Sequence, residues 1–110
     1  MTRKFITTGE FERAWKEMDL TDEDLAEVQY TILLNPEAGI LMRETGGLRK
    51  LRIPLEGRGK SGGARVCYVD FVVKETIYLI TAYPKSEKEN LSKAERNEIK
   101  KLIEHLEKTL

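Results

Sequence analysis

The sequence predicts an α+β domain with helices at both ends and strands between them. Apolar residues recur at helical spacing over 9–34 and again over 92–108. Short runs rich in β-branched and aromatic residues, bounded by glycine or proline, occupy 48–53, 64–70 and 76–83. Segregated helices and strands are typical of the α+β class. With 110 residues, 40% hydrophobic and 35% charged, the chain fits one soluble domain with a modest core.

Two helices are expected near the N-terminus, after a short strand over 3–7. Thr7 and Glu10 have the spacing of a capping box for a helix over 9–18. A second helix begins at Thr21, whose acidic first turn suits the positive end of the helix dipole, and an Asn-Pro pair ends it. Only two or three residues join the two helices, which predicts an αα-hairpin.

A small, mostly antiparallel sheet and a last helix complete the predicted domain. The run 76–83 is apolar on both faces, which indicates a central strand. The strands 48–53 and 64–70 are joined by a long glycine-rich loop, and together with 76–83 they are expected to form this sheet. Ser92 and Glu95 form a second capping box, from which a helix runs to about Lys108.

Cationic residues are concentrated between Arg43 and Arg65. This segment holds seven Lys or Arg and two acids, whereas the whole chain has a formal net charge of +0. Side chains alternate along a strand, so Lys50 and Arg52 share one face while the intervening Leu and Ile face the opposite side. The neutral total argues against a protein that coats nucleic acid through bulk charge. The sequence therefore predicts a local anion-binding surface.

Several other classes of site are not supported by the sequence. Cys67 is the only cysteine, which excludes an internal disulfide and fits a reducing, cytoplasmic location. We expect no signal peptide, membrane span, metal site or cofactor, and His105 is read as an ordinary surface residue. The stretch 57–63 looks superficially like a P-loop, but Pro54 stands where that motif needs glycine. Phosphate chemistry here must use Lys, Arg and Tyr.

Several strings in the chain resemble the RelE/HigB toxins of bacterial type II toxin–antitoxin systems, in particular the HigB-like branch. They are LLNPEAG at 33–39, TGGLRKLRIPLEGRGKSGGARVCY at 45–68, IYLITAYPKSEKENLS at 77–92 and the closing helix. The resemblance covers nearly all of residues 1–110 as a single toxin domain. It implies a RelE-like fold, in which an αα-hairpin packs on a small twisted sheet with a C-terminal helix. It also implies a ribosome-dependent mRNA endonuclease that cuts the codon in the A site.

The resemblance also implies the site residues and the partners. Catalytic roles fall to five residues, namely Lys50, Arg52, Arg65, Tyr83 and Lys85. Arg65 would stabilise the transition-state phosphate, Tyr83 would stack on an mRNA base, and Lys50 or Lys85 would transfer a proton. RNA contacts outside the catalytic set are expected from Arg49, Arg58 and Lys60. The implied partners are the 70S ribosome with mRNA and a HigA-like helix-turn-helix antitoxin, through which alone promoter DNA would be bound; no membrane partner is expected.

One alternative from a different class stays open at this point. The chain would then be a non-catalytic RNA- or partner-binding module on the same fold, a toxin homologue without activity. The neutral net charge and the lack of an obvious general base favour this alternative. Detection of new mRNA 5′ ends separates the two hypotheses, because a binding module produces none.

Overall fold

The structure is a computed structural model that describes residues 2–54 and 63–110. The elements in chain order are β1 (Lys4–Thr7), α1 (Gly9–Glu17), α2 (Asp22–Leu34), β2 (Ile40–Leu41), β3 (Arg49–Ile53), β4 (Ala64–Phe71), the 3₁₀ turn η1 (Val72–Lys74), β5 (Thr76–Pro84) and α3 (Lys93–Thr109). Within the described residues, no helix is long and apolar enough to cross a lipid bilayer.

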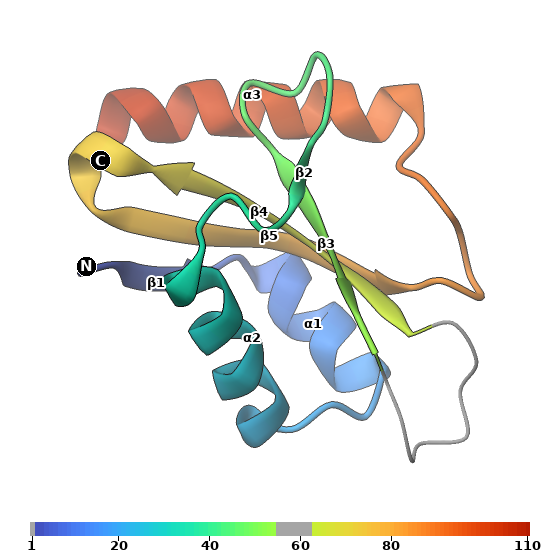
Figure 1. The fold of residues 1–110 in the computed structure, drawn as a ribbon. Coiled ribbons are helices and arrows are strands. Elements are labelled where there is room, and N and C mark those ends of the chain that lie inside the picture. Colours follow the sequence, from blue (N-terminus) through green and yellow to red (C-terminus); the bar gives the residue numbers. More distant parts are fainter. Residues whose placement is uncertain (1, 55–62) are drawn as a thin grey trace.

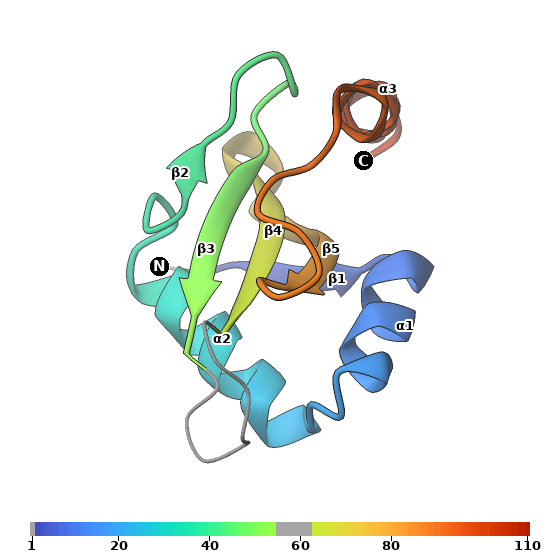
Figure 2. The ribbon, with the colours of Figure 1, turned by 90° about the vertical axis from the view of Figure 1, so that its right-hand side faces the viewer.

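The strands form one five-stranded sheet in the order β1-β5-β4-β3-β2. Its pairs are antiparallel except β1 with β5, which are parallel. Helices α1 and α2 cover one face of the sheet and α3 lies across the other (Figure 1; Figure 2 shows the same layers from the side). The α+β prediction with a C-terminal helix is confirmed. The strand β2 was not predicted; it lies in the expected connector, and its two residues pair only with Arg49 and Lys50.

Two apolar cores lie on the two faces of the sheet. The core under α1 and α2 contains Phe11, Trp15, Val28 and Ile32, with Leu51 and Ile53 of β3 packed against it. The core under α3 contains Cys67, Val69, Ile80, Tyr83, Ile99 and Ile103. The sheet is therefore buried between two helical layers, and the face that a strand residue occupies decides which helices it contacts.

All three helices begin where the sequence predicts, but the capping residue of the first helix differs from the prediction. Thr21 and Ser92 cap α2 and α3, as predicted, and the predicted capping box at Ser92 is confirmed. Thr21 also forms a capping box, with Asp24, which was not predicted. The predicted capping box at Thr7 is wrong, because Thr7 is the last residue of β1 and pairs with Leu79 of β5. Thr8 is the N-cap instead, and its hydroxyl accepts a hydrogen bond from the backbone N–H of Phe11.

Tyr68 fixes the segment between α2 and β2 onto the sheet. Its hydroxyl accepts a hydrogen bond from the N–H of Gly39 at 2.9 Å and donates one to the carbonyl of Pro36 at 2.8 Å. A Cβ on Gly39 would lie 2.9 Å from the Tyr68 ring, so only glycine fits at this approach. The contact holds the start of β2 beside β3, and thereby supports the strand that carries the basic residues.

Candidate functional site

A basic face is formed by Lys50 and Arg52 of β3 and Arg65 of β4. Arg52 is the direct Cα partner of Arg65, and Lys50 is the partner of Cys67. Because Leu51 and Ile53 pack under α1 and α2, their neighbours Lys50 and Arg52 lie on the opposite face of the sheet, as the strand alternation predicted. Cys67 belongs to the core under α3, which places Arg65 on this face as well. The ladder thus brings three cations together.

Arg65 is the most buried of these cations. The residue is 3% exposed, and its guanidinium makes one long hydrogen bond of 3.4 Å to the carbonyl of Ala64. Over residues 2–54 and 63–110, no carboxylate lies within 4.0 Å of Lys50, Arg52 or Arg65. Like charges directly opposite on a sheet repel, and a buried charge without a partner is costly. Such an arrangement suits a surface that receives an anion.

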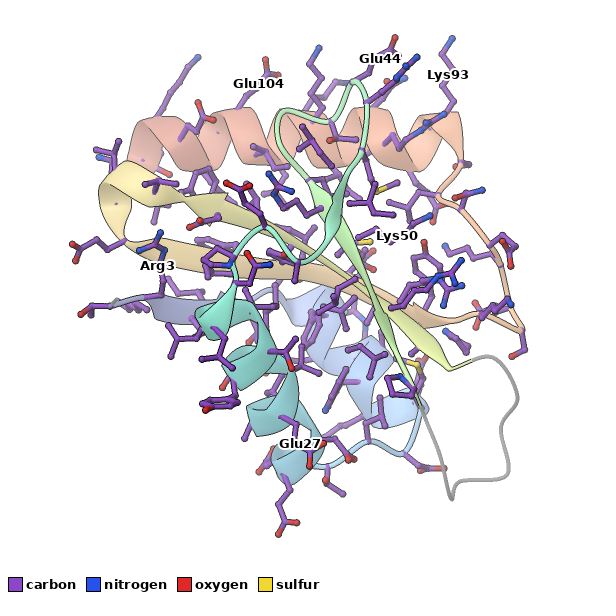
Figure 3. All side chains as sticks on the ribbon, in the orientation of Figure 1. Arg3, Glu27, Glu44, Lys50, Lys93 and Glu104 are labelled. Carbon is purple, nitrogen blue, oxygen red and sulfur yellow. The ribbon has the colours of Figure 1, made fainter. Side chains whose placement is uncertain are left out.

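The link between β5 and α3 borders the basic face and contributes polar groups to it. The Lys50 ammonium donates a hydrogen bond of 2.7 Å to the side-chain carbonyl of Asn90, and Figure 3 shows Lys50 on the side of β3 that faces this link. Lys85 stands directly after β5, exposed and 3.9 Å from Glu89. Of the predicted lysines, Lys85 therefore belongs to this link and Lys50 contacts it through Asn90.

Tyr83 and Cys67 form the apolar floor beside Arg65. Tyr83 is the Cα partner of Arg65, is 2% exposed, and its hydroxyl has no hydrogen-bond partner in the described part of the chain. Burial, together with the neighbouring Cys67, raises the pKa of Tyr83 far above its ordinary value, and burial raises the pKa of the Cys67 thiol to about 12. Neither group ionises near neutral pH, so Cys67 is not a thiolate nucleophile.

The predicted stacking role of Tyr83 does not fit its present environment. The ammonium of Lys88 lies 5.1 Å from the centroid of the Tyr83 ring. With that cation over it and almost no exposed surface, the ring offers no open face to a base. The stacking role stays a prediction, and it requires Lys88 to move.

Of the three residues predicted to bind RNA outside the catalytic set, the structure describes only one. Arg49 is not brought to the basic face: it has the same strand parity as Leu51, and its guanidinium donates to the carbonyl of Gly39 at 2.9 Å. Arg58 and Lys60 lie outside the described residues. Sequence reasoning missed Asn90 and Lys88, whose only signal was their place within the string at 77–92. Among the described residues, no group of three or more His, Cys, Asp or Glu is placed to hold a metal ion.

Comparison with known proteins gives the family. A family model described as the RelE toxin of the RelE/RelB toxin–antitoxin system matches residues 3–110. The fold is similar to a solved structure of the Escherichia coli toxin RelE, an arginine-to-alanine double mutant in the free state. The TM-score is 0.54 at 22% identity, and the match covers 81% of this chain and 90% of that one. Toxins of this family are in general endoribonucleases that cleave mRNA. Because the family match spans almost the whole chain, this protein belongs to the RelE toxin family of toxin–antitoxin systems.

Proposed function

We propose that this protein is a HigB-like, ribosome-dependent mRNA endonuclease that stops translation by cutting the codon in the ribosomal A site. One observation carries the proposal. Lys50, Arg52 and Arg65 share one sheet face, and none is within ion-pair distance of a carboxylate in the described residues. The absence of a neutralising carboxylate among the described residues supports a site whose anion is a phosphodiester.

The chemistry that such a face suits is attack by the RNA's own 2′-hydroxyl. The 2′-oxygen forms a bond to the adjacent phosphorus, the bond from phosphorus to the 5′-oxygen breaks, and the products carry a 2′,3′-cyclic phosphate and a 5′-hydroxyl. The 2′-hydroxyl must lose its proton, the 5′-oxygen must gain one, and the negative phosphorane must be stabilised. The reaction needs no further reactant, and we expect cleavage to continue in the presence of a chelator of divalent metals.

We assign the roles by the chemistry of each side chain. Arg65 and Arg52 retain their charge at neutral pH and present planar donors, so they hold the phosphate and stabilise the transition state. Lys50 and Lys85 are the candidates for proton transfer, because an amine can give up and take back a proton whereas a guanidinium does so far less readily. The hydrogen bond to Asn90 orients Lys50.

The proposed partners follow from the family and from the charge distribution. We propose that an antitoxin of the HigA type, with its own helix-turn-helix, binds and silences this toxin, and that any contact with promoter DNA is made by that antitoxin. Contact with the ribosome is assigned to the basic segment 43–65, because the chain as a whole is neutral. A reading frame for a short helix-turn-helix protein beside this gene would support the pairing.

The decisive experiment is primer extension on an mRNA translated by ribosomes in the presence of the purified protein. The wild type is expected to produce new 5′ ends within A-site codons, and the same mRNA without ribosomes is expected to stay intact. Arg65→Ala should lower the cleavage rate by about 100-fold or more, as expected for the loss of one transition-state donor. Arg13→Ala is the matched control, because Arg13 is exposed on α1 and this helix covers the other face of the sheet.

Each result decides between the hypotheses. If Arg65→Ala remains folded by circular dichroism and cleaves as fast as Arg13→Ala, the assignment of the site is wrong. If the wild type leaves no new 5′ ends but still binds ribosomes, the chain is the non-catalytic module. If free mRNA is cut as fast as translated mRNA, ribosome dependence is wrong while the nuclease assignment stands.

A further inference from the structure

We infer that Lys88 is a further RNA-binding residue of this site, held against Glu95 in the free protein and transferred to an RNA phosphate on binding. The inference rests on the proposed function, since it concerns the same face. It adds a residue that the motif comparison did not identify, and it gives the link between β5 and α3 a role in receiving RNA.

The position of Lys88 places it beside the buried part of the basic face. Its ammonium lies 5.1 Å from the Tyr83 ring centroid, and Tyr83 is the Cα partner of Arg65. Lys50 and Lys88 both act on the buried Cys67 thiol through their charges. Lys50 of β3 and Lys88 of the link therefore both lie near Cys67, which is two residues from Arg65 on β4.

Glu95 is the fixed partner in the ion pair and Lys88 is the exchangeable one. Glu95 is the third residue of α3, and its carboxylate accepts the N–H of Ser92 at 2.8 Å as half of the capping box. The same carboxylate accepts a hydrogen bond from the Lys88 ammonium, which lowers the pKa of Glu95. The cap remains when Lys88 leaves, because its two hydrogen bonds do not involve the lysine.

The exchange of partners is favourable for electrostatic reasons. The side chains of Lys88 and Glu95 are 33% and 41% exposed, so water screens the pair and little stability depends on it. Lys88 lies over Tyr83, the Cα partner of Arg65, and so adds a cation beside a pair of opposed arginines, Arg52 and Arg65, whose like charges repel. A bound phosphate relieves this repulsion, and its oxygens can also accept a hydrogen bond from the Lys88 ammonium. The departure of Lys88 also removes the cation that lies over the Tyr83 ring, as the predicted stacking on a base requires.

The test measures binding and cleavage separately on programmed ribosomes. The binding probe is an mRNA with 2′-O-methyl groups in the A-site codon, which has no free 2′-hydroxyl to attack. Lys88→Ala is expected to weaken binding about 10-fold, as for the loss of one charge-assisted hydrogen bond, and to make the slope of log affinity against log salt shallower by about 0.7. Lys88→Arg should restore both the affinity and the salt slope. In Lys88→Ala, kcat for cleavable mRNA should change less than about 3-fold.

Two further variants separate an RNA contact from a structural role. Lys93→Ala is the matched control, because Lys93 is nearby on α3 but points away from the sheet (Figure 3), and it should leave the salt slope unchanged. Glu95→Gln keeps a capping residue while removing the charge, so it should bind RNA at least as tightly as the wild type. A structural ion pair predicts the opposite, namely that Glu95→Gln and Lys88→Ala are equally impaired.

The inference is overturned if Lys88→Ala shows the same affinity and salt slope as Lys93→Ala, or if Glu95→Gln loses binding together with Lys88→Ala. Should Lys88→Ala fail to fold, Lys88→Gln is measured against Lys88→Arg by the same criteria. Failure of the proposed function is recognised separately: the wild type would then cleave no mRNA, while the salt slope on the uncleavable probe still reports whether Lys88 contacts RNA.

Discussion

Arg52→Thr is expected to make the free protein more stable and at the same time less active in RNA cleavage. Arg52 and Arg65 are direct Cα partners across β3 and β4, so their charges face each other on one side of the sheet. Like charges in this position destabilise an antiparallel pair by roughly 0.2–1 kcal/mol. Arg52 is exposed, so its replacement leaves no cavity, and threonine is a good strand former.

The expected gain in the free energy of unfolding is therefore about 0.2–1 kcal/mol, which corresponds to an increase in Tm of roughly 1–8 °C for a domain of this size. The assay is urea denaturation at low salt and at 1 M NaCl. The screening length falls to roughly 3 Å at 1 M salt, so the gain should shrink there. Arg43→Thr is the control for stability, because Arg43 is exposed in a turn outside the ladder, and it should change the free energy by less than about 0.5 kcal/mol.

Two outcomes would refute the reasoning about the opposed arginines. One is a lower free energy of unfolding for Arg52→Thr at low salt. The other is a gain that is equal at low and high salt, since a gain without screening does not come from charge repulsion. If stability rises as expected but mRNA cleavage is unaffected, the repulsion is real and Arg52 has no part in the reaction.

Two further predictions concern the buried framework. Stability should fall as pH rises above 9, because the unfolded chain loses the Cys67 proton near its ordinary pKa of 9.0 whereas the folded protein keeps it to about 12. For this group the free energy of unfolding falls by at most about 1.4 kcal/mol per pH unit. Between pH 8 and 10.5, the urea midpoint of Cys67→Ala should therefore fall less steeply than that of the wild type. Parallel slopes for the two proteins would contradict the role of Cys67. Gly39→Ala should lower the free energy of unfolding by about 1–3 kcal/mol, because the new methyl group clashes with Tyr68. Gly9→Ala is the control and should change it little, because the nearest atom to its new methyl group is 4.0 Å away. Equal urea midpoints for the two variants would show that the clash is absent.

Local sequence patterns determined much of the fold. The capping boxes at Thr21 and Ser92 involve residues three apart, so the helix starts could be identified without knowledge of the tertiary structure. The alternation of Lys50 and Arg52 with Leu51 and Ile53 is equally local, because it depends only on the geometry of one strand. The misplaced cap at Thr7 shows the limit of this reasoning: Thr7 pairs in the sheet, and Thr8 caps the helix in its place.

Contacts between distant residues were decided only by the tertiary structure. Arg65 stands opposite Arg52 because of the register between β3 and β4, which no local pattern fixes. Lys50 meets Asn90, 40 residues away, and Lys88 meets the Tyr83 ring, through the path that the chain takes from β5 to α3. The sequence by itself determined which residues are cationic and which strand face they share, since both are local properties. Their convergence on one face, the exclusion of Arg49 and the position of Lys88 depend on packing and register, which are set by the whole chain.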